Sequence, residues 1–144
     1  MYIIYNVLII LILILYIPII IYKLIKGKYK KELRERFGIL SNSIKDRFHN
    51  EPTIWIHAVS VGETVAASSV VKKLRKKFPE YKIVFSTVTT TGQEMAHKIL
   101  EENVDNIIYF PLDLSSMVKK AIKTIDPDLV MIMETELWPN FIKQ

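Results

Sequence analysis

Three carboxylates in this chain stand where acid–base chemistry could be done: Glu63, Glu134 and Glu136. Glu63 follows a Ser60-x-Gly62 turn and begins a helix-like run, so it is a candidate general base that would take a proton from an attacking hydroxyl. The alternative is an ordinary acid in the first turn of a helix, where the helix dipole favours it. Glu134 and Glu136 follow an apolar strand-like run, and alternation puts both on one side. They either stabilise charge or hold a hydroxyl in a site, or they are solvated loop acids.

Two glycine-containing turns accompany these acids. Ser60 and Gly62 precede one helix-like run, and Thr91 and Gly92 open the next. Backbone N–H groups at the first turn could hold an anion, but this turn lacks the signatures of a phosphate loop and of a dinucleotide site. Trp138 could stack on a sugar or pack under a loop.

The sequence gives little indication of a site built on histidine, cysteine or a metal ion. The chain has no cysteine, which excludes disulfides, thiolate ligands and a cysteine nucleophile. His57 lies inside a strand-like run and is expected in the core, whereas His97 is expected on a helix surface. No residues with metal-ligand spacing and no Ser-His-Asp order are found, so we expect no metal site.

An alternation of strands and helices must position these residues. Runs of apolar and β-branched residues predict strands at 53–59, 82–88, 106–110 and 128–133. Helical spacing predicts helices at 63–78, at 92–102, and from Asp113 or Ser115 to 125. This order indicates a Rossmann-like α/β domain with a parallel sheet. Ligands of such sheets bind beyond the carboxyl ends of the strands, so the polar clusters after the four strands should meet at one rim.

Charge divides the 144 residues into three segments. Residues 1–22 contain no charged side chain, residues 23–51 hold nine Lys or Arg against four acids, and residues 52–144 are neutral. The formal net charge of +5 therefore lies in the middle segment. This segment lacks interleaved aromatic residues, so nucleic-acid binding is not expected.

The uncharged segment 1–22 predicts a membrane anchor. Twenty-two helical residues reach ~33 Å, against a hydrocarbon core of ~30 Å. A cleavable signal peptide is the rival, but the basic residues follow the apolar run and no small-residue cleavage pattern is found. Pro18 would kink a spanning helix, so partial or tilted insertion stays open. Basic residues beside a span stay cytoplasmic, so the domain is expected on the cytoplasmic face, with Lys23–Arg36 near anionic lipids.

Four motifs together resemble the N-terminal half of the 3-deoxy-D-manno-octulosonic acid (Kdo) transferase family. They are His57-Ala-Val-Ser-Val-Gly-Glu63, the run from Thr87 to Gly92, Phe110-Pro-Leu-Asp-Leu114, and Met133-Glu-Thr-Glu-Leu-Trp-Pro-Asn140. The apolar start and the run Arg34-Glu-Arg-Phe-Gly38 share the likeness, which covers essentially the whole chain.

The resemblance implies the N-terminal, acceptor-side domain of a GT-B glycosyltransferase of the bacterial inner membrane. Such an enzyme transfers Kdo from CMP-Kdo to a lipid A precursor in lipopolysaccharide synthesis, inverting the anomeric centre without a metal or cofactor. Glu63 matches the family's catalytic base, and Glu134 matches a residue assigned to transition-state stabilisation. The candidate acceptor-binding residues are Ser60, Gly62, Thr91, Gly92, Glu136, Trp138 and Asn140.

The resemblance also implies a donor-binding C-terminal domain beyond residue 144. We therefore expect segments 1–22 (anchor), 23–51 (basic) and 52–144 (incomplete acceptor-side domain), with no transfer by this chain alone and the C-terminal half as a partner. Two alternatives stay open: a membrane-anchored α/β module that binds a lipid or protein without chemistry, and a different glycosyltransferase or epimerase with the same half-fold.

Overall fold

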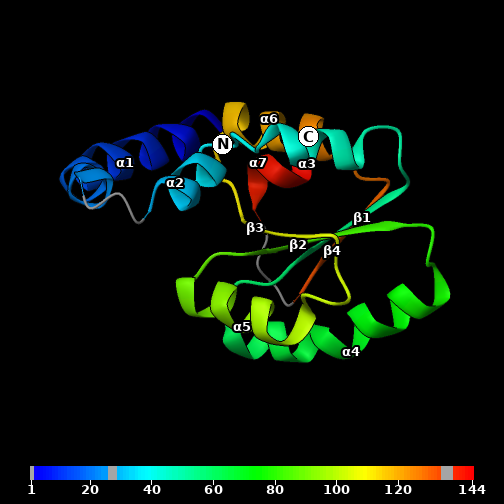
Figure 1. Ribbon diagram of the computed structural model, residues 1–144. Helices are drawn as coiled ribbons and strands as arrows, with labels where there is room; N and C mark the ends of the chain where they lie inside the picture. Colours follow the sequence, from blue (N-terminus) through cyan, green and yellow to red (C-terminus); the bar gives the residue numbers. More distant parts are fainter. Residues whose placement is uncertain (1, 26–28, 134–137) are drawn as a thin grey trace.

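The computed structural model describes residues 2–25, 29–133 and 138–144 (Figure 1). Its helices are α1 (Tyr2–Ile25), α2 (Lys30–Arg36), α3 (Asn42–Phe48), α4 (Val61–Lys77), α5 (Thr90–Leu100), α6 (Ser115–Ile125) and α7 (Pro139–Lys143). Its strands are β1 (Thr53–His57), β2 (Lys82–Thr87), β3 (Asn106–Tyr109) and β4 (Leu129–Ile132). The strands and helices predicted from residue 53 onward are all present, with ends within two residues of the prediction.

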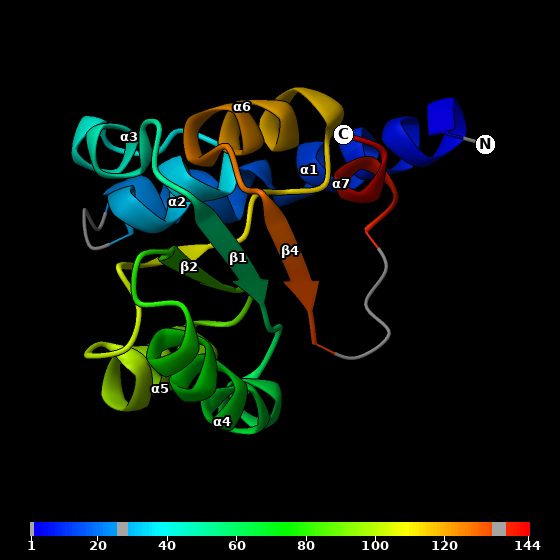
Figure 2. The ribbon, with the colours of Figure 1, turned by 90° about the vertical axis from the view of Figure 1, so that its right-hand side faces the viewer.

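The four strands form one parallel sheet in the order β3-β2-β1-β4. Helices α4 and α5 cover one face, and the remaining helices lie on the opposite side (Figure 2). This three-layer arrangement confirms the α/β class with a parallel sheet. Strand β1 is buried along its whole length because helices cover it on both faces. Strand β4 lies at a sheet edge and leaves Leu129 and Val130 partly exposed.

Each face of the sheet has its own apolar core. Alternation along β1 sends Ile54 and Ile56 to the side of α4 and α5, where they pack with Ala67, Val71 and other apolar residues. Trp55 points the other way, toward residues from α3, α6 and α7. The side chains that join Trp55 there include Ile44, Phe48, Val118, Ile125 and Phe141.

The basic segment contains two short helices that the sequence analysis did not predict. Helix α2 buries Leu33, and α3 buries Ile44 and Phe48 in the core shared with α6. The connection passes Gly38, whose φ of +72° suits glycine. A Cβ on Gly38 would lie 2.1 Å from the Met117 carbonyl oxygen, so this position also needs glycine for close packing on α6.

Helix α1 is the apolar N-terminal helix that the sequence predicts. Among the described residues, the stretch Ile4–Tyr22 alone is long and apolar enough to cross a membrane. Its side chains are mostly exposed, yet α1 lies in the same layer as α2, α6 and α7 (Figures 1 and 2). The division into an anchor 1–22, a basic segment and a domain from residue 52 stays a prediction.

Candidate functional site

Backbone hydrogen bonds join the carboxyl ends of the strands into one rim. The Val59 carbonyl, after β1, accepts hydrogen bonds from the Val88 and Thr89 amides after β2, at 3.2 and 3.1 Å. The Phe110 amide, after β3, donates to the Thr87 carbonyl at 2.9 Å, and the Met133 amide, after β4, donates to the His57 carbonyl at 2.8 Å. The predicted meeting of strand ends is therefore confirmed as far as Met133.

Glu63 lies in the first turn of α4, immediately after β1. One carboxylate oxygen accepts the Val59 amide at 2.5 Å, and the other accepts the Ser60 hydroxyl at 3.2 Å. Ser60 is the N-cap, so this is a variant of the capping box. A carboxylate has about four lone-pair sites, so two accepted bonds leave capacity on each oxygen for a further donor. Glu63 is thus held firmly and can still accept a substrate hydroxyl.

Gly62, beside Glu63, faces open space. A Cβ built on it would meet no atom within 4 Å, and its backbone has helical geometry. Packing within the described chain therefore does not require glycine here. Close approach of the backbone to a ligand is one of the uses of glycine, so Gly62 is a candidate for such a place.

Gly92, in the first turn of α5, has a structural reason to be glycine. A Cβ there would lie 2.8 Å from the Thr89 hydroxyl and 3.4 Å from backbone atoms of Val59 and Ser60. Thr89 caps α5 by accepting the Gly92 amide at 3.0 Å. Gly92 thus lets the starts of α4 and α5 pack together, while Thr91 is exposed beside them. Their role in acceptor binding stays a prediction.

An aromatic cluster lies beneath the rim. The His57 ring stacks on Phe110 with centroids 3.9 Å apart, and Trp138 packs against Phe110 at 5.6 Å. His57 is fully buried, as expected for a core histidine, and its Nδ1 contacts the Ser86 hydroxyl at 3.0 Å. Burial lowers the pKa of His57 to about 4, so the ring is neutral at pH 7. His97 is partly exposed on α5, as predicted.

Asp113, after β3, organises the start of α7. Its buried carboxylate accepts the backbone amides of Asn140 and Phe141 at 3.0 and 2.8 Å. Asp113 therefore caps α7. Of the two predicted starts of the helix that follows β3, Asp113 and Ser115, the structure has Ser115, with Leu114 as the N-cap of α6.

Asn140 belongs to the same polar cluster. Its side chain bonds the Asp113 carbonyl, the Ser115 hydroxyl and the Asn6 side chain of α1. This geometry gives Asn140 a role in holding the fold, and its predicted part in acceptor binding is not tested. Trp138 packs under the rim, and its indole nitrogen is buried with no hydrogen-bond partner among the described residues.

Helix α2 brings charged residues to the rim that the sequence analysis missed. Arg36 donates to the Val88 carbonyl at 2.5 Å and lies over the Tyr109 ring, 4.7 Å from its centroid. The buried Glu35 carboxylate accepts the Tyr109 amide at 2.9 Å. Burial raises the pKa of Glu35 and of Tyr109. The sequence signal that this segment packs on the domain is a series of apolar residues three or four positions apart among the charges: Leu33, Phe37, Leu40, Ile44 and Phe48.

The predicted acids Glu134 and Glu136 lie outside the described residues. The structure therefore assigns neither of them a position. It does place the residues on both sides, since Met133 is bonded to the end of β1 and Trp138 packs on Phe110. In the described part of the chain, no three His, Asp or Glu side chains gather closely enough to hold a metal ion.

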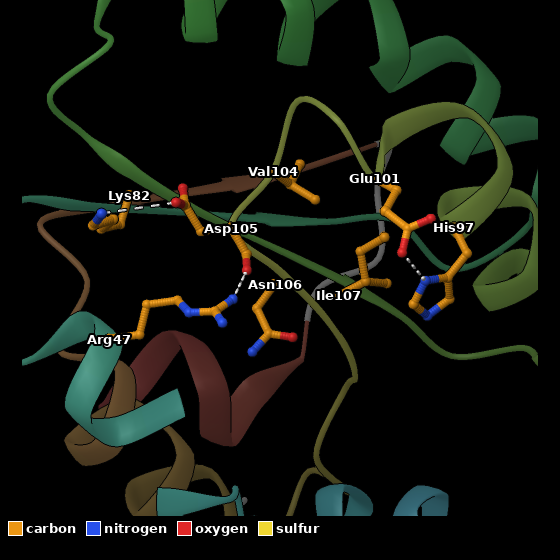
Figure 3. A pocket seen from close by; sticks show the side chains of 8 residues that line it. All are labelled: Arg47, Lys82, His97, Glu101, Val104, Asp105, Asn106 and Ile107. Carbon is orange, nitrogen blue, oxygen red and sulfur yellow. Dashed lines mark hydrogen bonds and ion pairs between the residues drawn. The ribbon is translucent and has the colours of Figure 1, made fainter. Parts of the chain in front are cut away.

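A hollow of about 510 Å³ lies at the opposite end of the sheet (Figure 3). Lys82 and Asn106, at the amino ends of β2 and β3, line it, together with Arg47 and Asp105. Asp105 is ion-paired with Arg75 and Lys82 and accepts the Ile83 amide, so its charge already has partners within the fold. None of the predicted site residues that the structure describes lines this hollow.

Comparison with known proteins identifies the family. Residues 31–144 match the family described as 3-Deoxy-D-manno-octulosonic-acid transferase (kdotransferase). The chain is similar to the 3-deoxy-D-manno-octulosonic acid transferases of three bacteria. Identity is 38% over 117 residues for Haemophilus influenzae, 34% over 129 for Chlamydophila psittaci and 30% over 141 for Chlamydia pneumoniae. These matches cover 81%, 89% and 97% of this chain.

The chain spans only part of each relative. The matched regions make up 26%, 29% and 32% of the lengths of these three proteins. The family match covers the rim, including the Glu63 turn and the Asp113 cluster, and ends with the residues of α7. From these matches, the chain belongs to the 3-deoxy-D-manno-octulosonic-acid transferase family.

Proposed function

We propose that this chain forms the N-terminal, acceptor-side part of a GT-B glycosyltransferase that moves Kdo from CMP-Kdo to a lipid A precursor. The observation that carries the proposal is the firmly held Glu63 carboxylate at the end of β1, beside the open backbone of Gly62. It supports the role of general base that the resemblance implies for this residue. The printed names of the relatives, 3-deoxy-D-manno-octulosonic acid transferase, support Kdo as the sugar that is transferred.

In the proposed reaction, a hydroxyl of the lipid A precursor attacks the anomeric carbon of Kdo while its proton passes to Glu63. The bond from Kdo to CMP breaks, and CMP leaves with the electron pair. Attack opposite the leaving group inverts the anomeric centre. A positioned base contributes typically 10²–10⁴-fold to the rate of such a step. Glu134 would stabilise charge in the transition state, and no metal or cofactor is required.

Transfer needs both substrates to be held in register. The CMP-Kdo donor would be bound mainly by the part of the enzyme that the relatives possess beyond the matched region. We therefore propose that the 144 residues alone bind the acceptor and transfer no sugar. Ser60, Gly62, Thr91, Gly92, Glu136, Trp138 and Asn140 stay the proposed acceptor-side residues.

The apolar α1 and the basic residues after it support attachment to the cytoplasmic face of the bacterial inner membrane. A lipid A precursor is itself anchored in a membrane by its acyl chains, so a membrane-bound enzyme meets it in two dimensions. Basic residues in the range Lys23–Arg36 would contact anionic lipid headgroups.

The test joins this chain to the remaining part of the Haemophilus influenzae relative and measures transfer of radiolabelled Kdo to a lipid A precursor. Glu63→Gln keeps the shape and the capping role of the side chain, because Gln also serves in capping boxes, but removes the base. It should lower transfer at least 100-fold with unchanged unfolding. The matched control Glu80→Gln changes an exposed acid just beyond the far end of α4 and should leave transfer unchanged.

A near-normal rate for Glu63→Gln would refute the base role. A joined protein that binds the lipid A precursor but shows no transfer, even without substitutions, would favour the alternative of a non-catalytic lipid-binding module.

A further inference from the structure

Both halves of α1 contact the same domain. Near its start, the Tyr5 hydroxyl donates to the Asp113 carboxylate at 2.9 Å. The Asn6 side chain accepts a hydrogen bond from the Asn140 side chain at 2.9 Å. Near its end, Ile20 lines an apolar groove together with Leu33 and Phe37 of the α2 region. The helix therefore lies along the domain, as Figures 1 and 2 both show.

These contacts are incompatible with a helix that stands across the bilayer while the domain stays on one side. From Tyr5 to Ile20 the helix rises ~22 Å at ~1.5 Å per residue. In a spanning helix, one of these residues would lie that much deeper than the other, inside a hydrocarbon core of ~30 Å. Asp113 and Asn140 are buried polar residues of the domain and would have to follow Tyr5 and Asn6 into the lipid.

One stripe of α1 faces the domain, and the other sides face outward. The partly buried residues of the stripe are Tyr5, Asn6, Ile9, Leu13 and Ile20. At about 100° per residue they fall within about 100° of the helix circumference. The stripe carries the polar residue Asn6, which is bonded to the domain. The stripe is therefore a protein-facing surface.

The outward sides of α1 are apolar. The exposed residues there are Ile4, Val7, Leu8, Ile10, Leu11, Ile12, Ile14, Leu15, Tyr16, Ile17, Ile19, Ile21 and Tyr22, at 43% to 80% exposure. A continuous apolar surface of this size is not stable in water and indicates a membrane or a partner. The charge of the neighbouring surface distinguishes a membrane from a protein partner.

A basic strip continues from the outward side of α1. Three neighbouring hollows share Ile39, itself 45% exposed, and together they run from α1 over α2 to α3 and α6. The strip consists of the basic residues that line them: Lys30, Lys31, Arg34, Lys45, Lys120 and Lys123. Glu35 is the one acid among the described residues that line these hollows, and it is buried. Apolar surface beside this excess of basic charge complements acyl chains and anionic headgroups, rather than a protein.

We propose that α1 lies in the plane of a single membrane leaflet, with its outward sides in the acyl layer and the basic strip on anionic headgroups. Both ends of the helix then stay on the side of the domain, so α1 does not span the bilayer. The inference rests on the membrane attachment in the proposed function, but it does not depend on Kdo transfer. It adds Lys45, Lys120 and Lys123, on α3 and α6, to the lipid-facing residues expected from the sequence.

The side on which each end of α1 lies can be measured by thiol labelling, because the chain has no cysteine. One protein carries a single Cys in a short polar tag before Met1, and another carries Lys72→Cys on the exposed side of α4. Each is expressed in a Gram-negative host and treated with a membrane-impermeant maleimide. An in-plane helix predicts that both thiols are protected in spheroplasts and labelled in inside-out vesicles. Labelling of the tag in spheroplasts, with Lys72→Cys protected, would show a spanning helix and overturn the proposal.

The basic strip is tested by exchanging charge at matched pairs of lysines. Lys120→Glu with Lys123→Glu reverses two charges of the strip, whereas Lys72→Glu with Lys73→Glu makes the same change on α4, across the sheet. The first pair should weaken partitioning onto vesicles of phosphatidylcholine with phosphatidylglycerol by roughly tenfold or more. The second pair should change it little. Equal effects of the two pairs would overturn the role of the strip.

The outcomes separate this inference from the proposed function. Recovery of the unmodified chain in the soluble fraction, as a dimer or larger assembly, would show that α1 packs on a second copy and would overturn membrane docking. Loss of transfer in the joined enzyme, with both thiols still on the cytoplasmic side, would count against the proposed function and leave the topology standing.

Discussion

The open space over Gly62 leads to a prediction in which stability and activity change in opposite directions. Gly62→Ala places a methyl group on the first turn of α4, where a Cβ meets no atom of the described residues within 4 Å. If a ligand approaches the backbone here, the methyl group occupies the space that the ligand needs. The substitution therefore tests whether the glycine serves the fold or the site.

The expected magnitudes follow from the geometry. Alanine in place of glycine at a helical position without strain stabilises a protein by about 0.4–1 kcal/mol, chiefly by restricting the unfolded chain. Overpacking a filled site costs about 1–3 kcal/mol. If the new methyl group overpacks against a bound ligand, the same cost of about 1–3 kcal/mol would lower the rate of transfer by roughly 5- to 150-fold. We therefore expect Gly62→Ala to be slightly more stable and much less active.

Gly92→Ala supplies the comparison, because its new Cβ would lie 2.8 Å from the Thr89 hydroxyl that caps α5. Displacing that cap should destabilise the chain by about 1–2 kcal/mol. Urea unfolding of the full chain in detergent micelles measures both stabilities, and the radiolabelled Kdo assay of the joined enzyme measures transfer. Normal transfer by a stable Gly62→Ala protein would refute the assignment of the open space to a ligand, and destabilisation by that substitution would contradict the absence of contacts around this Cβ position.

Two further predictions concern buried polar groups. The pKa of His57 is about 4 in the fold against 6.5 for an ordinary histidine, so the stability that comes from its neutral form is complete above pH 6.5. This stabilisation is lost as the pH falls toward 4, by roughly 3 kcal/mol in all. Urea unfolding between pH 4 and 7 measures the free energy of unfolding. His57→Gln should remove its pH dependence, whereas His97→Gln should not. Asp113→Asn should cost about 2 kcal/mol, because the amide provides one acceptor oxygen where the carboxylate accepts three donors; the exposed Asp46→Asn is its control, and an equal effect of the two would exclude a special role for Asp113.

The strands and the three long helices of the domain could be predicted because their patterns are local. Strand β1 has the apolar residues Ile54, Trp55 and Ile56 in succession, as is typical of a strand buried on both faces. Pro79 ends the α4 pattern within two residues of its observed end. The meeting of the strand ends at one rim follows from the parallel order, so Glu63 could be placed there in advance.

Helices α2 and α3 are harder to predict because each has only seven residues, and charged residues separate their few apolar positions. Glu35 is an example: its carboxylate is buried because it accepts the amide of Tyr109, which lies 74 positions away. The role of Asp113 also depends on distant partners, since it caps a helix that begins 26 positions later in the chain. Such contacts are set by tertiary packing, which leaves no periodic signal.

Under the proposed topology, helix α2 and Asp113 connect the lipid-facing surface of the protein with the rim at the strand ends. Helix α2 contributes Leu33 to the groove under α1 and Arg36 to the Val88 carbonyl at the strand ends. Asp113 binds Tyr5 of α1 on one side and the start of α7, beyond β4, on the other. An acceptor whose acyl chains stay in the leaflet beside α1 could therefore present its polar head to the rim without leaving the membrane. A spanning α1 would lose the Tyr5–Asp113 bond, and the lipid-facing side of α1 would then no longer adjoin the rim that holds Glu63.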